Sequence, residues 1–175
     1  MKTAKEIALI GVYTALLIGG QFALSAISGV EVVTVLFLSF AFYYGVKRAL
    51  VVAVTFSLIR CFLFGFFPNV IILYLVYYPL CALIFGGLGN LYGHKLNPKR
   101  HVLVIVVAVF ITVLFTLLDN VITPLYYGMK GEALKGYLYT SLYAVALQCL
   151  STILTLSVFL RPLIKLFQVV DKRGY

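Results

Sequence analysis

Long apolar runs recur along the whole chain and are separated by short polar stretches. A helix of about 20 residues crosses a hydrocarbon core roughly 30 Å thick, and most of the runs reach that length. They show no strand-like alternation, and a chain in lipid must satisfy its own backbone hydrogen bonds. The pattern therefore predicts an all-α integral membrane protein in which residues 1–175 form a single domain of six transmembrane helices. The predicted spans are 6–27, 32–45 (a short one), 49–66, 70–92, 102–127 and 138–160.

The composition agrees with a membrane protein and gives no sign of an enzyme. Hydrophobic residues make up 63% of the chain and charged residues 11%, with a mean hydropathy of +1.11. A soluble domain carries about 25% charged residues. The sequence contains no phosphate-binding loop, catalytic motif or carboxylate cluster, so we predict no enzymatic activity, cofactor or metal. His94 and His101 flank a basic loop and are expected to face solvent or lipid headgroups.

The net charge of +9 is distributed unevenly in a six-span arrangement. By the positive-inside rule, this distribution predicts that both termini are cytoplasmic. Aromatic side chains are not interleaved with the charges, so we expect no nucleic-acid partner. Two lysines, Lys130 and Lys135, fall on the outer side. The cations predicted on the inner side are Lys2, Lys5, Lys47, Arg48, Lys95, Lys99, Arg100, Arg161, Lys165, Lys172 and Arg173.

The first predicted span presents two different faces. At about 100° per residue, its small residues gather on one side, and Thr14, Gln21, Ser25 and Ser28 gather on the other. Small residues let a second helix backbone approach closely in lipid. That second helix can belong to this chain or to another protein, and both interpretations stay open at this point. The small-residue face comprises Ala4, Ala8, Gly11, Ala15, Gly19 and Ala23.

Three later spans also carry a polar or aromatic face. Helical spacing aligns these residues within each span, which is unusual in a segment surrounded by lipid. The fifth span aligns Thr112, Thr116, Asp119, Thr123 and Tyr126; the sixth aligns Ser141, Gln148, Thr152 and Thr155; the fourth aligns Tyr74, Tyr77, Tyr78 and Cys81.

Arg60 is the only Lys, Arg, Asp or Glu between Arg48 and Lys95. A lone guanidinium in an apolar helix requires a partner, because an unpaired charge in lipid is strongly unfavourable. Depth along the helices places Asp119, Glu31, Gln21 and Asn120 in the same outer half as Arg60. The partner of Arg60 is therefore Asp119 in a purely structural pair, Glu31, or a ligand. The third interpretation predicts an outward-facing pocket for a small planar or zwitterionic solute, lined by Arg60, Asp119, Asn120, Gln21, Glu31, Tyr74, Tyr77, Tyr78 and Gln148.

The sequence resembles the substrate-binding S components of energy-coupling factor (ECF) vitamin transporters. The resemblance covers the length, the six spans, the basic termini, the small-residue motif in "AKEIALIGVYTALLIGG" and the segment "SAISGVEVVTVLFLSFAFYYG". It implies a multi-pass protein of the bacterial plasma membrane that captures a vitamin outside. A transmembrane coupling protein and two cytoplasmic ATPases would be its partners. The docking surface for the coupling protein would be Ala4, Ala8, Gly11, Ala15 and Gly19.

The resemblance suggests cobalamin as the first candidate substrate, from the "GVEVVTVLF" region, with pyridoxine-like compounds and other vitamin precursors as alternatives. Two other classes of membrane protein are also considered. A scaffold, such as the cell-shape proteins of the MreD type, has a similar build and binds no solute. A self-contained secondary transporter would show inverted repeats and interrupted helices, and neither is evident in the sequence.

Overall fold

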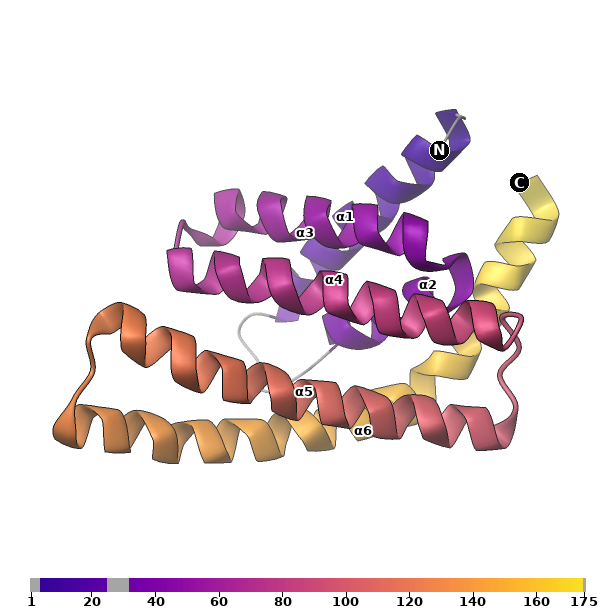
Figure 1. Ribbon diagram of the computed structural model, residues 1–175. Coiled ribbons are helices and arrows are strands. Elements are labelled where there is room, and N and C mark those ends of the chain that lie inside the picture. The colour runs from indigo at the N-terminus through magenta and orange to yellow at the C-terminus, as the bar shows by residue number, and fades with distance from the viewer. Residues whose placement is uncertain (1–3, 25–31, 175) are drawn as a thin grey trace.

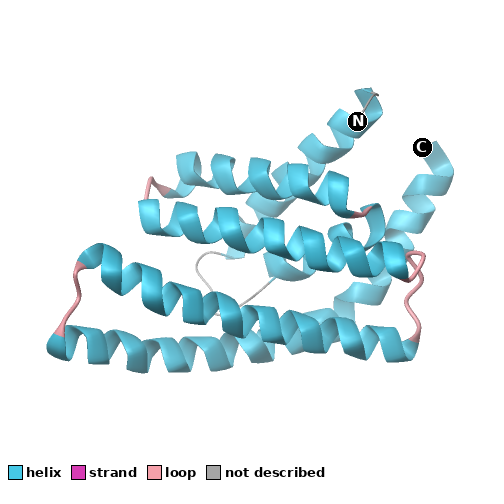
Figure 2. Cartoon of the chain, viewed as in Figure 1, coloured by secondary structure: helices cyan, strands magenta, loops and turns pink. Residues whose placement is uncertain are grey.

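The computed structural model describes residues 4–24 and 32–174, and every regular element in these ranges is an α-helix (Figure 1, Figure 2). The all-α class predicted from the hydropathy pattern is confirmed for this part of the chain. Each of the six predicted apolar runs corresponds to one helix. The helices are α1 (Ala4–Leu24), α2 (Val32–Tyr44), α3 (Val46–Phe64), α4 (Pro68–Leu91), α5 (Pro98–Tyr127) and α6 (Gly131–Gly174).

Four of these helices, α1, α4, α5 and α6, are long and apolar enough to cross a membrane. The helix α2 has only 13 residues, as the short second run predicted. The helix α6 continues far beyond residue 160, where the apolar run ends, because charged residues such as Lys165 are compatible with a helix outside lipid. Pro162 lies within α6, and Figure 1 shows the yellow end of α6 turning away from α5.

The helices pack as two hairpins and a central short helix. The hairpin α3–α4 lies beside the hairpin α5–α6, with α4 against α5 (Figure 1). The short α2 packs against α3, α4 and α6, so it forms the middle of the bundle. Three of its side chains, Phe37, Phe40 and Phe42, are completely buried. The helix α1 packs against α2 and α3.

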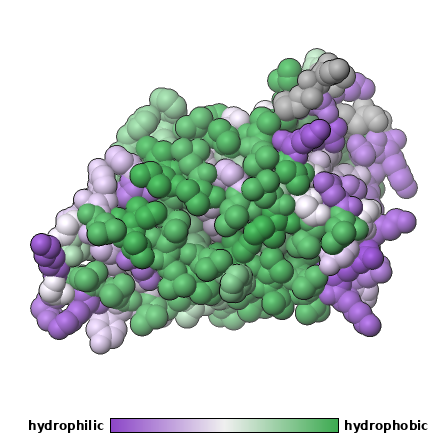
Figure 3. Space-filling view, in the orientation of Figure 1, coloured by the Kyte–Doolittle hydropathy of each residue, from purple (hydrophilic) through white to green (hydrophobic). Residues whose placement is uncertain are grey.

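The polar residues gather at the ends of the bundle and leave an apolar band between them. Figure 3 shows hydrophobic residues over the middle of the visible face and hydrophilic residues mainly at the right. We call that right-hand end the basic end: it holds the beginning of α1, the α2–α3 turn, the loop 92–97 and the end of α6 (Figure 1). In the band, Phe22, Phe62 and Leu125 are more than 70% exposed. A soluble monomer rarely exposes so much apolar surface, whereas a membrane protein turns it toward lipid.

Glycines allow α4 to approach the α2–α3 turn. A Cβ atom on Gly89 would overlap the backbone carbonyl of Phe42, and one on Gly86 would lie 2.7 Å from the backbone nitrogen of Val46. Real Cβ contacts are never that short, so only glycine fits at either position. The segment "FGGLGN" is therefore a helix-packing element.

Both histidines contact backbone carbonyl groups. The expectation that they face solvent or headgroups is wrong for His101, which is buried, whereas His94 is partly exposed. Nδ1 of His94 lies 2.9 Å from the carbonyl oxygen of Phe42. His101 is buried, and its Nε2 lies 3.1 Å from the carbonyl oxygen of Leu156. The His94 ring therefore connects the loop before α5 to α2, and the His101 ring connects the start of α5 to α6.

Candidate functional site

The carboxylate of Asp119 lies between α5 and α6 and accepts hydrogen bonds at both oxygens. The Tyr137 hydroxyl donates to Oδ2 at 2.6 Å, and the Thr123 hydroxyl donates to Oδ1 at 2.6 Å. Thr123 is one turn further along the same helix, whereas Tyr137 comes from α6. Both carboxylate oxygens therefore have a hydroxyl partner, and hydrogen bonds of this length to a carboxylate are strong.

The network around Asp119 extends to a third helix. Asn69, in the first turn of α4, is buried and donates from Nδ2 to Oγ1 of Thr123 at 3.1 Å. The connected series Asn69, Thr123, Asp119 and Tyr137 therefore links α4, α5 and α6. The network lies in the half of the bundle that is remote from the basic end, because Asp119 is close to Tyr127, the last residue of α5.

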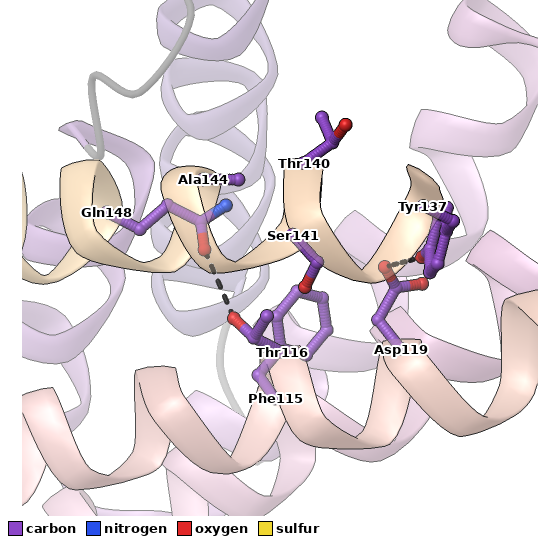
Figure 4. A pocket seen from close by; sticks show the side chains of 8 residues that line it. All are labelled: Phe115, Thr116, Asp119, Tyr137, Thr140, Ser141, Ala144 and Gln148. Atoms are coloured by element: carbon purple, nitrogen blue, oxygen red, sulfur yellow. Dashed lines mark hydrogen bonds between the residues drawn. The ribbon is translucent and has the colours of Figure 1, made fainter. Parts of the chain in front are cut away.

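A cavity of about 180 Å³ opens beside this carboxylate. Figure 4 shows Ser141 and Gln148 directed from α6 toward Thr116 and Phe115 on α5, with Tyr137 beside Asp119. The Thr116 hydroxyl donates to Oε1 of Gln148 at 3.3 Å. The hydroxyl oxygen of Ser141 is buried and has no partner among the described residues. An unsatisfied buried hydroxyl is unfavourable and indicates a missing hydrogen-bonding group. The cavity is lined by Phe115, Thr116, Asp119, Tyr137, Thr140, Ser141, Ala144 and Gln148.

Arg60 belongs to a different cluster. Its guanidinium lies 4.1 Å from the centroid of the Tyr74 ring and 5.3 Å from that of Phe64. Gln21 on α1 donates from Nε2 to the Tyr74 hydroxyl at 3.4 Å. Within the described part of the chain Arg60 forms no ion pair, so the structural Arg60–Asp119 pair considered from the sequence is wrong. The physical reason is that Asp119 already accepts hydrogen bonds from two hydroxyl groups, whereas the Arg60 guanidinium lies against aromatic faces. The buried Nε of Arg60 has no hydrogen-bond partner among the described residues.

Phe115 connects the two clusters. Its ring lines the cavity, and its centroid lies 4.4 Å from that of Tyr77 and 6.4 Å from that of Tyr74. The structure therefore divides the sequence-predicted binding residues. Asp119 and Gln148 line the cavity. Gln21, Arg60 and Tyr74 lie together outside it, in the cluster that Phe115 contacts through Tyr74.

The remaining predicted residues do not line the cavity. Tyr77 and Tyr78 are buried in the hydrophobic core, where Tyr78 packs edge-on against Phe37. Asn120 has a buried Oδ1 without a partner among the described residues. Glu31 lies outside the described residues.

Sequence reasoning did not assign a site role to Tyr137, Asn69 or Ser141. A signal for Tyr137 was present, since Asp119 and Tyr137 are each nine residues from Gly128, which ends α5 in a left-handed conformation. A tight helical hairpin brings residues at equal distances from its turn close together. Asn69 carried no comparable signal, because its contact depends on how α4 packs against α5.

The small-residue face of α1 is exposed and borders a groove between α1 and α3. Ala4, Ala8, Gly11, Ala15 and Gly19 are all exposed, and a Cβ atom on Gly11 or Gly19 would meet nothing within 4 Å. The opposite side of α1 is buried through Ile10, Tyr13, Thr14 and Leu17. The interpretation that these small residues pack inside the chain is therefore wrong. Beside them, a groove of about 500 Å³ runs between α1 and α3, with Ile59 and Leu63 on its far wall.

Comparison with protein-family models, with curated proteins and with solved structures gives no match. The fold and the site together define the class of the protein at a coarse level. It is an all-helical protein, over the residues described, with four apolar helices of membrane-spanning length. The half-buried Asp119 carboxylate and a small cavity lie between two of those helices, α5 and α6.

Proposed function

We propose that this protein is the substrate-binding membrane subunit of an ECF-type importer. The observation that carries the proposal is the cavity between α5 and α6, which combines the Asp119 carboxylate with the unsatisfied Ser141 hydroxyl. Ionisable groups within apolar helices are unfavourable and are most often functional. A cavity with few, well-placed polar groups is the usual form of a small-molecule site.

The charge distribution sets the orientation in this proposal. The basic end is cytoplasmic by the positive-inside rule, which puts both termini inside. In this proposal the six helices alternate in direction across the membrane, and the 13-residue α2 crosses only part of it. The cavity then lies in the outer half, because Asp119 is near the end of α5 opposite its basic start. A solute would reach it from outside the plasma membrane of a bacterium.

The chemistry of the cavity favours a small ring compound with hydrogen-bond donors or a positive charge. Asp119 is an acceptor and the only charged residue of the lining, while Phe115 and Tyr137 supply aromatic faces. Drug-sized ligands occupy pockets of about 300 Å³ or more, and this cavity measures about 180 Å³. A pyridoxine-like vitamin or precursor therefore fits the volume better than cobalamin does.

The exposed face of α1 supports the second half of the proposal, in which the loaded subunit docks to a coupling protein. Small side chains allow a foreign helix backbone to approach to the close distance that stabilises helix pairs in lipid. The groove between α1 and α3 provides room for the side chains of that helix. Two cytoplasmic ATPases of the same complex would supply the energy.

The test is native mass spectrometry of the protein purified from cells, followed by titration with pyridoxine-like vitamins and cobalamin. The key variant is Ser141→Ala. The Ser141 hydroxyl has no partner among the described residues, so its loss should not lower the unfolding temperature of the solute-free protein, but it removes a contact to the solute. We expect solute affinity to fall about three- to tenfold, the value of one neutral hydrogen bond.

The matched control is Ser157→Ala on the same helix, at an exposed position away from the cavity. It should leave both affinity and stability unchanged. If no small molecule co-purifies and none of the vitamins binds, the solute-binding function is wrong and a scaffold becomes the better interpretation.

A further inference from the structure

A groove at the basic end is surrounded by three cations. Lys95 comes from the loop after α4, and Arg161 and Lys165 come from α6. The groove has a volume of about 420 Å³, and Leu96 and Ile164 contribute apolar surface to it. We call it the cationic groove.

The three cations have no anionic partner. None of them forms an ion pair with any residue that the structure describes. The nearest acid along α6, Asp171, accepts a hydrogen bond from Tyr43 instead. Like charges gathered around one groove repel each other, and an anion in the groove would relieve that repulsion.

The loop wall of the groove is held in place by several contacts. Arg100 donates hydrogen bonds to the carbonyl groups of Tyr92 and Lys95, at 3.2 and 3.3 Å, and its guanidinium stacks 4.6 Å from the Tyr92 centroid. Gly93 and His94 both have positive φ, 59° and 57°, which fixes the turn that leads to Lys95. The contact of His94 with the Phe42 carbonyl anchors this turn to α2.

The helical wall is equally well anchored. Ile164 and Phe167 are buried, and the Phe167 ring packs against Tyr13, Tyr43 and Tyr44. The backbone that carries Arg161 and Lys165 is therefore held against the bundle beyond Pro162. Two rigid walls keep the three cations around one groove, so less ordering is needed when a ligand binds.

The position of the groove indicates which anion it binds. Leu154, Val158, Arg161 and Lys165 share one face of α6 by helical spacing, so this face changes from apolar to basic along the chain. Leu154 and Val158 are 56% and 60% exposed and belong to the apolar band. An acyl chain could lie on them while a phosphate group of the same molecule reaches the cations.

We propose that the cationic groove binds the phosphate headgroup of an anionic phospholipid, whose acyl chain lies along the apolar face of α6. The shared chemistry is a phosphate group, which a soluble phosphate could also supply. The adjoining apolar surface of Leu154 and Val158 favours the lipid. This site is at the opposite end of the bundle from the Asp119 cavity and does not depend on the solute-binding function.

The experiment compares lipids in detergent solution by native mass spectrometry and by thermal unfolding. The probes are phosphatidylglycerol, phosphatidylcholine and inorganic phosphate. We expect the protein to retain phosphatidylglycerol and to be stabilised by it more than by the other two probes. The triple variant Lys95→Gln, Arg161→Gln, Lys165→Gln should lose that preference. Each juxtamembrane cation contributes severalfold to the affinity for an anionic lipid, so we expect a drop of about tenfold or more.

The matched control removes three cations that do not line the groove, with Lys47→Gln, Lys99→Gln and Lys172→Gln. This variant has the same net charge as the first and should keep the preference for phosphatidylglycerol. An equal loss in both variants would show diffuse attraction to a basic surface and overturn the site. Equal stabilisation by inorganic phosphate would overturn the lipid assignment. If the first variant does not fold, the single exposed change Arg161→Gln replaces it, with Lys99→Gln as its control.

Discussion

Tyr137 on α6 donates a hydrogen bond of 2.6 Å to the carboxylate of Asp119 on α5. This contact joins the two helices that form the candidate cavity, and it places an aromatic ring beside the one charged group of the lining (Figure 4). Thr123 on α5 donates to the other oxygen of the same carboxylate, so hydrogen bonds from both α5 and α6 hold it in place. Asp119 therefore links the two helices that line the cavity.

Replacing Tyr137 by phenylalanine should destabilise the protein. The change keeps the ring and removes the donor to a charged acceptor, for which a loss of about 1.5–3 kcal/mol is expected. Thermal unfolding in detergent measures the effect. Tyr139→Phe is the control, because Tyr139 is 74% exposed on the same helix. Equal unfolding temperatures for the two variants would contradict the importance of the Asp119 contact.

Gly89→Ala should destabilise the fold far more than Gly87→Ala. A Cβ at Gly89 overlaps the Phe42 carbonyl, which belongs to rigid backbone, so we expect a loss of about 3 kcal/mol or more. A Cβ at Gly87 meets nothing within 4 Å, and alanine is the better helix former by up to about 1 kcal/mol. The unfolding temperatures should therefore change in opposite directions. A mild effect at Gly89 would mean that α2 and α4 are further apart than described.

The helices and the two faces of α1 could be predicted from the sequence because they follow from local patterns. Apolar length determines where a helix can lie in lipid, and helical spacing determines which residues share a face. Thr14 is buried and Ala15 is exposed, as the separation of polar and small residues on α1 indicated. These local patterns do not show which helix packs against each face.

The partners of the buried polar groups depend on how the helices pack. Depth along the membrane placed Arg60 and Asp119 in the same half, but depth does not determine the direction in which each helix turns its side chains. Tyr74 lies between Arg60 and Phe115, so the cation contacts a ring before it can reach α5. The contact of Asn69 with Thr123 could not be predicted from the sequence for the same reason.

The proposed topology can be checked by cysteine labelling in intact cells. A membrane-impermeant thiol reagent should label Glu132→Cys in the α5–α6 region, because this residue is exposed and lies at the end remote from the basic end. It should not label Asn97→Cys or Thr3→Cys. Both positions should react once the cells are opened. Labelling of Asn97→Cys from outside would show that the orientation is the reverse of the proposed one and that the cavity lies in the inner half.

Ala15→Trp should weaken assembly with a coupling protein. The bulky ring would fill the groove between α1 and α3 and hold a partner helix away from the small-residue face. Solute affinity should stay within a few-fold, because Ala15 is not part of the cavity lining. Co-purification with the coupling protein measures the effect, and Val106→Trp, on the exposed side of α5, is the control. Normal co-purification of the Ala15 variant would rule out this face as the docking surface.

Double-mutant cycles should identify Tyr74, and not Asp119, as the energetic partner of Arg60. A cation above an aromatic ring contributes about 0.5–2 kcal/mol, so Arg60→Met and Tyr74→Leu should be non-additive by that amount in the free energy of unfolding. Tyr74→Phe keeps the ring, so the interaction between Arg60 and residue 74 should be retained in that variant. Arg60→Met and Asp119→Asn should be additive within about 0.5 kcal/mol, as expected for side chains that share no contact. A larger coupling energy between Arg60 and Asp119 would show that the two side chains form an ion pair and that the guanidinium lies at the cavity.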